Sequence, residues 1–131
     1  MKSSYDKGEN PLLDKSLELA LFIANKVKQH KEERNFSIKN YLCQISRSSN
    51  SIAANSAEAQ AFISNKFKFS KLNIALGECY ETRIHAEILF KIEIFSELEY
   101  NYVVGLCDEI TRILSSAIFK LRCLINYDTK K

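Results

Sequence analysis

The chain has 131 residues, of which 46% are hydrophobic and 27% charged, and its formal net charge is +3. This length suits a single domain with a real core, and the composition is ordinary for a soluble globular protein. Three glycines and one proline are too few for the many turns of an all-β fold, so the composition predicts a few long helices. The sequence lacks a run of about 18 apolar residues, which argues against a transmembrane helix.

The first eleven residues, MKSSYDKGENP, are polar and lack the apolar core of a signal peptide. We therefore expect residues 1–9 to be flexible and the protein to be cytoplasmic. Cysteine occurs at four widely spaced positions without a C-x-x-C pair, namely Cys43, Cys79, Cys107 and Cys123. Without a secretion signal, this pattern predicts reduced core cysteines rather than disulfides or zinc ligands.

The first helix is predicted to begin at Asn10-Pro11, with Asn as the N-cap and Pro at the first helical position. Asp14 then lies in the first turn, where the helix dipole favours a negative charge. Apolar residues follow at helical spacing and define the expected core face: Leu13, Leu17, Ala20, Leu21, Ala24 and Val27. The pattern fades in the charged run 28–35.

The second helix is predicted to start at Ser37 as its N-cap. Its core residues follow a heptad seam with alternating steps of four and three: Ile38, Leu42, Ile45, Ser49, Ile52, Ser56, Ala59 and Ile63. The seam continues through QISRSSNSIAANSAEAQA, residues 44–61, so this stretch is predicted to be a helix and not a linker. Its small residues allow a neighbouring helix or subunit to approach closely.

A polar stripe runs beside this seam and consists of Gln44, Arg47, Ser51, Asn55 and Glu58. Such a stripe is usually a solvated face. Asn and Ser are poor residues for a helix interior, however, because their side chains compete for backbone hydrogen bonds. A hydrogen-bonded row at an interface, where it sets the register of the packing, is the alternative.

The third helix is predicted to follow a boundary at Ser64-Asn65. Its expected core face is interrupted by Arg83 and otherwise consists of Phe69, Leu72, Leu76, Cys79, Ala86 and Leu89. Ser96 and Glu99 form a capping box that opens the fourth helix. The expected core residues of that helix are Leu98, Tyr102, Leu106, Ile110, Ile113, Ala117, Leu121 and Leu124.

The fourth helix is predicted to end near Tyr127, which leaves a frayed tail at 128–131. Because the connections are short, adjacent helices should be antiparallel. The sequence therefore predicts an all-α fold, an antiparallel up-down-up-down four-helix bundle spanning residues 10–127.

Residue patterns of the common catalytic sites are missing from the sequence. A di-iron bundle needs Glu-x-x-His on two helices, whereas Glu81 and His85 are four residues apart on one helix, and His30 lies in a charged run. Neither a P-loop, a dinucleotide fingerprint nor a nucleophile elbow is found. We expect no metal site, no cofactor and no enzymatic activity.

Basic residues are unevenly distributed along the chain. Residues 1–71 carry 12 Lys and Arg against 7 Asp and Glu, and residues 72–131 carry 7 against 9. This asymmetry suits either a nucleic acid or the meeting of basic and acidic faces of two subunits. The segment NKFKFSKLN, residues 65–73, suits single-stranded nucleic acid by its mix of lysine and phenylalanine. Since Phe67 and Phe69 point about 200° apart on a helix, a solvated helix start is the alternative.

Two segments, QISRSSNSIAANSAEA (44–59) and KLNIALGECYE (71–81), resemble the family of four-helix bundle proteins encoded in intervening sequences of bacterial 23S ribosomal RNA genes. Family sequences typically read Q-I-R-R-A-A-x-S-I-P-S-N-I-A-E-G and F-L-N-I-A-L-G-S-x-x-E. The residues that match these motifs are Gln44, Arg47, Ser51, Ile52, Asn55, Ala57, Glu58, Leu72, Asn73, Ala75, Leu76, Gly77 and Glu81.

The chain departs from the family pattern at four positions. Ser46 replaces an Arg, which weakens the case for a phosphate contact there. Ala53 replaces a Pro and Ala59 a Gly, so the second helix should be straighter than is usual. Arg83 stands where a second Glu is common.

The resemblance implies a homo-oligomer, namely a pentameric ring or barrel of bundles, without enzymatic activity. Similar bundle proteins serve diversity-generating retroelements as accessory factors that bind nucleic acid and a reverse transcriptase. The residues implied in subunit packing are the polar stripe together with Asn73, Gly77 and Glu81. Glycine inside a helix costs about 1 kcal/mol relative to Ala, and close approach of another backbone at Gly77 would explain it.

Two hypotheses follow. The first is a non-catalytic oligomeric bundle that binds RNA or DNA through its basic surfaces. The residues expected to contact phosphates are Lys26, Lys28, Lys31, Arg34, Arg47, Lys66, Lys68 and Lys71. The alternative is a structural or adaptor oligomer whose partner is another protein, such as a reverse transcriptase, and whose interface is the polar stripe.

Overall fold

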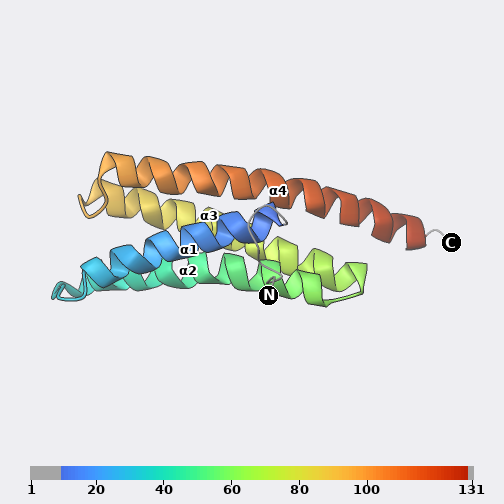
Figure 1. Cartoon of the computed structure of the whole chain (residues 1–131), viewed down its shortest axis with the longest axis horizontal. Helices are drawn as coiled ribbons and strands as arrows, with labels where there is room; N and C mark the ends of the chain where they lie inside the picture. The colour runs from blue at the N-terminus through green and yellow to red at the C-terminus, as the bar shows by residue number, and fades with distance from the viewer. Residues whose placement is uncertain (1–9, 130–131) are drawn as a thin grey trace, which may run out of the picture.

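The computed structural model describes residues 10–129, which fold into four helices and contain no strand (Figure 1). The helices are α1 (Pro11–Gln29), α2 (Phe36–Ala61), α3 (Asn65–Lys91) and α4 (Glu97–Thr129). The prediction of an all-α fold with four helices is confirmed. The predicted flexible residues 1–9 lie outside the described part of the chain, and α4 continues two residues beyond its predicted end at Tyr127.

Two helix starts are capped as the sequence predicts. The Oδ1 atom of Asn10 accepts a hydrogen bond from the Leu13 backbone N–H at 3.1 Å, and Pro11 opens α1. At α4, the Glu99 N–H donates to the Ser96 Oγ at 3.1 Å, and the Ser96 N–H donates to the Glu99 carboxylate at 2.8 Å. This is the reciprocal capping box.

The start of α2 differs from the prediction. Its N-cap is Asn35, whose Oδ1 accepts from the Ile38 N–H at 3.1 Å, whereas Ser37 lies inside the first turn. Asn and Ser are equally good N-caps, so a sequence that offers both leaves the start uncertain by two residues.

Each helix packs against two neighbours. α1 lies beside α2 and α4, and α3 lies beside the same two helices, so α1 is diagonally opposite α3 and α2 is diagonally opposite α4. The chain turns back at each connection (Figure 1). Arg47 of α2 pairs with Glu81 of α3, and later in α2 Glu58 pairs with Lys71, which comes earlier in α3. This reversed order is the one expected of an antiparallel pair.

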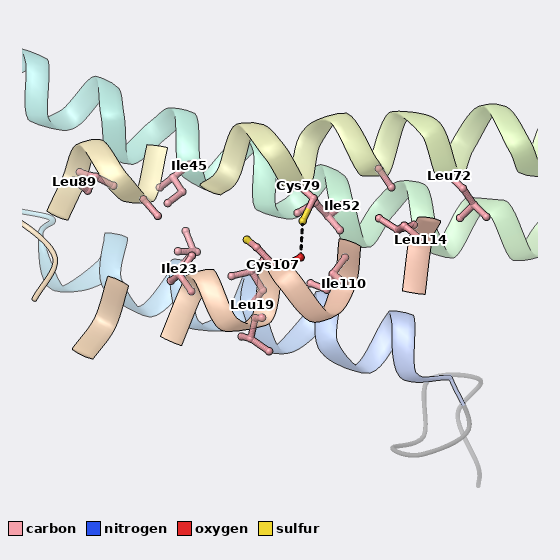
Figure 2. Close-up of a cluster of buried hydrophobic side chains, with 14 of the residues drawn as sticks. Leu19, Ile23, Ile45, Ile52, Leu72, Cys79, Leu89, Cys107, Ile110 and Leu114 are labelled. Carbon is pink, nitrogen blue, oxygen red and sulfur yellow. Dashed lines mark hydrogen bonds between the residues drawn. The ribbon is translucent and has the colours of Figure 1, made fainter. Parts of the chain in front are cut away.

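The core lies along the axis of these four helices (Figure 2). In α2 and α3 the buried residues alternate at steps of three and four, as in a coiled coil. The buried residues of α2 that follow this spacing are Leu42, Ile45, Ser49, Ile52, Ser56 and Ala59. Those of α3 are Leu72, Ala75, Cys79, Thr82, Ala86 and Leu89. The predicted α2 seam is confirmed except at its ends, since Ile38 is only half-buried and Ile63, beyond the last turn of α2, is 97% exposed.

The core face of α1 is rotated from the predicted one. Of the predicted residues only Leu13 is fully buried, and the others in the core are Ser16, Leu19, Ile23 and Lys26. Leu17 and Ala24 are exposed and Leu21 is 63% exposed. Apolar residues occur almost all around this helix, so its periodicity does not select one face.

The predicted core of α3 and α4 is also corrected in part. Thr82 takes the core position next to Arg83, and Arg83 lies at the surface in an ion pair with Asp108. In α4 the buried residues are Val103, Leu106, Cys107, Ile110, Leu114 and Ile118. The predicted core residues Leu98, Tyr102 and Leu124 are exposed instead.

Hydroxyl groups occupy several positions inside the core. The Ser48 and Thr82 hydroxyls are 2.7 Å apart and join α2 to α3, and Thr82 also donates to the Glu78 carbonyl oxygen at 2.9 Å. The Ser16 and Ser56 hydroxyls are buried without a hydrogen-bond partner among residues 10–129. A buried polar group without a partner destabilises the fold, so these two serines are tolerated for their small size.

Only two of the four cysteines belong to the core. Cys79 and Cys107 are buried, and the Cys79 thiol lies 3.4 Å from the Cys107 carbonyl oxygen (Figure 2). Contact with Cys79, together with burial, raises the pKa of the Cys107 thiol far above its ordinary value, which keeps this thiol protonated. Cys43 and Cys123 are exposed, which corrects their prediction as core residues.

The four helices differ in length. α1 has 19 residues and α4 has 33, which corresponds to about 28 Å and about 50 Å at the usual helical rise. The C-terminal end of α4 therefore extends beyond the start of α1 (Figure 1). At this end of the bundle α4 packs beside the start of α3, where the Arg122 guanidinium lies over the Phe69 ring at 5.7 Å from its centroid.

Candidate functional site

The polar stripe of α2 lies beside α3, and its charged members are paired within the chain. The Arg47 guanidinium contacts the Glu81 carboxylate at 2.6 Å and the Glu78 carboxylate at 3.3 Å. The hydrogen bond to Glu81 raises the pKa of Arg47, and the same bond lowers the pKa of Glu81 below its ordinary value. Glu58 pairs with Lys71 at 2.7 Å. Arg47 and Glu58 therefore each bind α3 and not one another.

The middle of the stripe is held by bonds within α2. The Asn55 side-chain amide donates to the Ser51 carbonyl oxygen at 2.9 Å and to the Ser51 hydroxyl at 3.0 Å. Both residues are half-buried, as is Gln44. The stripe is thus neither fully solvated nor fully buried. Arg47 and Glu58 bind α3, whereas Ser51 and Asn55 bond each other and stay accessible to a neighbouring molecule.

The residues of α3 singled out by the family motif lie close to this stripe. Glu81 bonds Arg47 as described, and the exposed Asn73 side chain donates to the Phe69 carbonyl oxygen at 2.8 Å. Gly77 faces open space, because a Cβ atom built on it meets no atom of the described chain within 4 Å. Nothing inside the described part of this subunit requires a glycine there, so a close approach at Gly77 would have to come from outside residues 10–129.

The eight basic residues predicted to contact phosphates do not form one surface. Lys26 does not belong to any such surface, because it is only 8% exposed and pairs with Glu99 of α4 and with Gln29. Arg47 and Lys71 are held by the acidic residues named above. The ion pairs of Lys26, Arg47 and Lys71 could not be predicted from the sequence, because the acidic partners lie on other helices.

The remaining basic residues gather at the two ends of the bundle. Lys28, Lys31 and Arg34 lie at the end of α1 and in the α1–α2 connection, and all three are exposed. Lys66 and Lys68 lie in the first turn of α3, at the opposite end (Figure 1). Within residues 10–129 these five side chains form no ion pair.

Apolar side chains are exposed along the sides of the bundle, which the sequence analysis missed. A shallow groove of about 240 Å³ lies between α1 and α2. It is lined by two leucines of α1, Leu13 and Leu17, and by three alanines of α2, Ala53, Ala54 and Ala57. Leu21 lies one turn further along α1 and is 63% exposed. This set is called the α1/α2 groove below.

A second apolar face lies on the outside of α3. Ile74, Tyr80 and Ile84 are about half exposed, and at 100° per residue they lie within about 60° of Gly77 around the helix. The exposure of this face could have been predicted from the sequence, because Ile74 and Ile84 both fall outside the heptad seam of α3. Exposed apolar side chains that share one face are typical of protein interaction surfaces.

Residues 10–129 provide neither a metal-binding cluster nor a membrane-spanning helix. No group of three or more His, Cys, Asp and Glu side chains in this range is arranged to hold a metal ion; His85 contacts only Glu81, at 3.6 Å. None of the helices in the same range is both long enough and apolar enough to cross a membrane.

The match to a family model decides which family the chain comes from. Residues 9–116 match the model of the 23S rRNA-intervening sequence protein. The chain belongs to this family. No match was found among curated proteins.

The structure is similar to a solved one. It resembles the crystal structure of a protein with unknown function from the S23 ribosomal protein family of Bacteroides thetaiotaomicron. The two sequences are 36% identical, the TM-score is 0.74, and the match covers 82% of this chain and 97% of the other. The resemblance noted in the sequence is thereby confirmed, and α4 beyond residue 116 lies outside the family match.

Proposed function

We propose that this 23S rRNA-intervening sequence protein is a non-catalytic homo-oligomer, with an antiparallel up-down-up-down bundle as its subunit, that binds RNA or DNA. A ring of five subunits is the assembly that the family resemblance suggests. In this proposal the sides of the bundle associate with other copies, and the basic ends contact phosphates.

The observations that support the proposal are exposed apolar residues along the sides of the bundle and basic residues at its ends that are unpaired within residues 10–129. The sides carry the α1/α2 groove and the outer face of α3 with Ile74 and Ile84. The ends carry Lys28, Lys31, Arg34, Lys66 and Lys68, whose charges are not neutralised within the described residues. Burial of the apolar sides between subunits would leave these ends free and would repeat them around an assembly, which adds their attraction for a polyanion.

A second candidate is an adaptor that binds another protein, such as a reverse transcriptase. The α1/α2 groove favours this candidate, because alanines on one helix and leucines on the other offer a shallow apolar surface against which side chains of a partner helix could pack. Under this alternative the basic ends are solvent-exposed and contact no ligand. Charge reversal at these ends would then leave the affinity for the protein partner unchanged.

Size-exclusion chromatography with light scattering, at low and at high salt, separates these candidates. The proposal expects a mass that is a multiple of the 15.1 kDa subunit, with nucleic acid that co-purifies at low salt and is removed by high salt. An oligomer that binds no oligonucleotide at any salt concentration contradicts nucleic-acid binding and favours the adaptor. A monomer at all concentrations contradicts the role given to the apolar sides.

Charge-reversed variants show which residues cause the salt dependence of the nucleic-acid affinity. Lys28→Glu with Lys31→Glu reverses two of the three cations at one end, and Lys66→Glu with Lys68→Glu reverses the two at the start of α3. Removal of one phosphate contact should flatten the plot of log affinity against log salt concentration by about 0.7 to 0.9. The matched control is Arg83→Glu with Asp108→Arg, which exchanges the partners of a surface ion pair on the side and leaves the net charge unchanged.

A further inference from the structure

One corner of the bundle combines exposed aromatic rings with basic side chains. It is built from the end of α2, the start of α3 and the end of α4 and is called the α2–α3–α4 corner. We propose, resting on the nucleic-acid binding proposed above, that this corner binds single-stranded nucleic acid by stacking a base on the paired rings of Phe62 and Phe67.

The two rings already form a stacked pair. Their centroids are 5.2 Å apart and their planes meet at 23°. Phe62 follows the last turn of α2 and is 37% exposed, while Phe67 lies in the first turn of α3 and is 57% exposed. Because each ring packs against the other, the outer ring is fixed in place and still offers surface to a ligand. Such a preformed platform loses little side-chain entropy when a base stacks on it.

Next to Phe67 along α3, Lys66 lines two surface depressions that lie between the start of α3 and the end of α4. One has a volume of about 320 Å³ and is lined by Lys66, Phe69, Arg122, Ile125 and Asn126. The other shares Lys66 and Ile125 and is also lined by Ser64, Asn65 and the acidic Asp128. At 100° per residue Lys66 lies between Phe67 and Phe69 around α3.

The charge of the corner suits a polyanion. Residues 58–71 and 120–129 contain five basic and two acidic side chains, and one of the two acids, Glu58, is paired with Lys71. Arg122 lies over the Phe69 ring, where its guanidinium keeps its charge and can bond a phosphate through its edge. Arg122 lies on the Phe69 side of α3, so a strand with one base on Phe67 would pass Lys66 around the start of α3 before its phosphates reach Arg122.

These features select a single strand over a duplex. In a duplex both faces of each base are covered by neighbouring bases, and a platform of rings has nothing to stack on unless the strand is opened. In a single strand every base offers a face, and stacking on an aromatic ring needs no particular sequence. RNA and DNA share this chemistry, and parallel measurements on both distinguish them.

Part of the corner lies outside the segment that matches the family model. Residues 9–116 are matched, whereas Lys120, Arg122 and Ile125 follow that segment on the extension of α4. The family match therefore covers the Phe62–Phe67 platform but does not reach the part of the corner that α4 provides.

The chain contains no tryptophan, so the platform can be tested with a single fluorescent residue. Phe67→Trp keeps a large aromatic ring at the platform, and Phe36→Trp places the same probe on an 82% exposed phenylalanine at the opposite end of the bundle. Each variant of the full chain is titrated with single strands of RNA and of DNA of about 20 nucleotides, and with the duplex of the same sequence. Stacking of a base should quench the fluorescence of the Phe67→Trp variant with single strands only, while the fluorescence of the Phe36→Trp variant, which lies beside Arg34 at the other basic end, should respond equally to single strands and to the duplex.

Affinity provides a second readout. Phe67→Ala should weaken binding of single strands by about fivefold to a hundredfold, which is the range for loss of one base–aromatic stack. Phe36→Ala should leave binding unchanged, and neither variant should alter the weaker, purely electrostatic binding of the duplex. Circular dichroism melting checks that both variants are folded, as expected for exposed side chains.

The outcomes separate this inference from the proposed function. Wild-type protein that binds oligonucleotides, with equal affinity for Phe67→Ala and Phe36→Ala and no quenching at position 67, overturns the platform and leaves nucleic-acid binding standing. Wild-type protein that binds no oligonucleotide at low salt overturns both. Quenching and loss of affinity with RNA alone, or with DNA alone, support the platform and identify the strand.

Discussion

Lys26 distinguishes a structural lysine from a phosphate-binding one. The sequence places it among the residues expected to contact nucleic acid, but the structure buries it between α1 and α4. Its Nζ atom contacts the Glu99 carboxylate, donates to the Gln29 side-chain oxygen at 3.0 Å and lies 6.0 Å from the centroid of the Phe95 ring. We predict that Lys26→Met lowers stability and leaves nucleic-acid affinity unchanged. Methionine keeps an unbranched apolar side chain up to the ε position and removes the terminal ammonium group with its charge and hydrogen bonds.

The size of the effect follows from the exposure of the two partners. Their side chains are 10% and 27% exposed for Lys26 and Glu99. Fully exposed ion pairs contribute about 0.2–1 kcal/mol, and buried hydrogen bonds to charged groups about 1.5–3 kcal/mol. This partly buried pair should lie between these ranges, so Lys26→Met should cost about 1.5 kcal/mol. For a chain of this length that corresponds to a fall in melting temperature of about 5 °C.

The effect should depend on pH. Burial acts to raise the pKa of Glu99, but the bonds from Lys26 and from Ser96 outweigh it, so the pKa is lower than the ordinary value of 4.5. A carboxyl group whose pKa is lower in the folded state stabilises the fold above its unfolded pKa, and this contribution disappears as the pH falls through the folded pKa. The difference between wild type and Lys26→Met should therefore be full at neutral pH and shrink as the pH falls below about 4.5.

Thermal unfolding followed by circular dichroism, at neutral and at acidic pH, measures these differences. Lys28→Met is the matched control, because Lys28 lies on the same last turn of α1 but is exposed and forms no ion pair among the described residues. Equal melting temperatures for the two variants, or a Lys26→Met protein that unfolds like wild type but loses nucleic-acid affinity, would refute the structural role.

Three further predictions concern the core, the glycine of α3 and the thiols. Ser56→Ala should stabilise the protein by about 0.5 kcal/mol, because it removes a buried hydroxyl without a partner among residues 10–129 and favours the helix. Ser48→Ala should destabilise it by about 1 kcal/mol, because the buried hydrogen bond that joins Ser48 to Thr82 is lost and Thr82 keeps only its bond to Glu78; denaturant unfolding that gives both changes the same sign would contradict this interpretation. Gly77→Ala should stabilise an isolated subunit by about 1 kcal/mol and weaken self-association, and light scattering that finds the assembly unchanged would exclude close packing at this glycine. A thiol reagent should modify Cys43 and Cys123 rapidly and the two buried cysteines only after unfolding; four rapid reactions in the folded protein would contradict the buried pair.

The sequence was informative where one face of a helix is apolar and the other polar. In α2 the heptad seam is bordered by the polar stripe, so the core face could be predicted almost residue by residue, and small residues such as Ser49 revealed close packing. In α1 the residues Leu17, Leu19 and Leu21 place large apolar side chains on opposite faces. Periodicity cannot tell which of these faces the core and which remains at the surface, so the prediction chose the wrong face.

The candidate site was less predictable, because its properties depend on contacts between helices. Acidic residues on neighbouring helices decide whether a lysine is neutralised by an ion pair. Glu99 neutralises Lys26 in this way, and Glu58 neutralises Lys71. The segment 65–73 was identified as a mix of lysine and phenylalanine, but its stacked ring comes from Phe62, on the other side of the α2–α3 turn. Spacing along one helix gives no information on either relation.

The strict alternation of three and four residues in the buried seams of α2 and α3 limits how the length of this protein can vary. A single inserted residue would turn every later side chain of the helix by about 100° and bring polar groups into the core. An insertion of seven residues nearly restores the orientation of the side chains, but it needs an equal insertion in the neighbouring helix to keep its new apolar turn covered. We expect related chains to differ by pairs of heptads within α2 and α3, and by any number of residues in the connections and in the projecting end of α4.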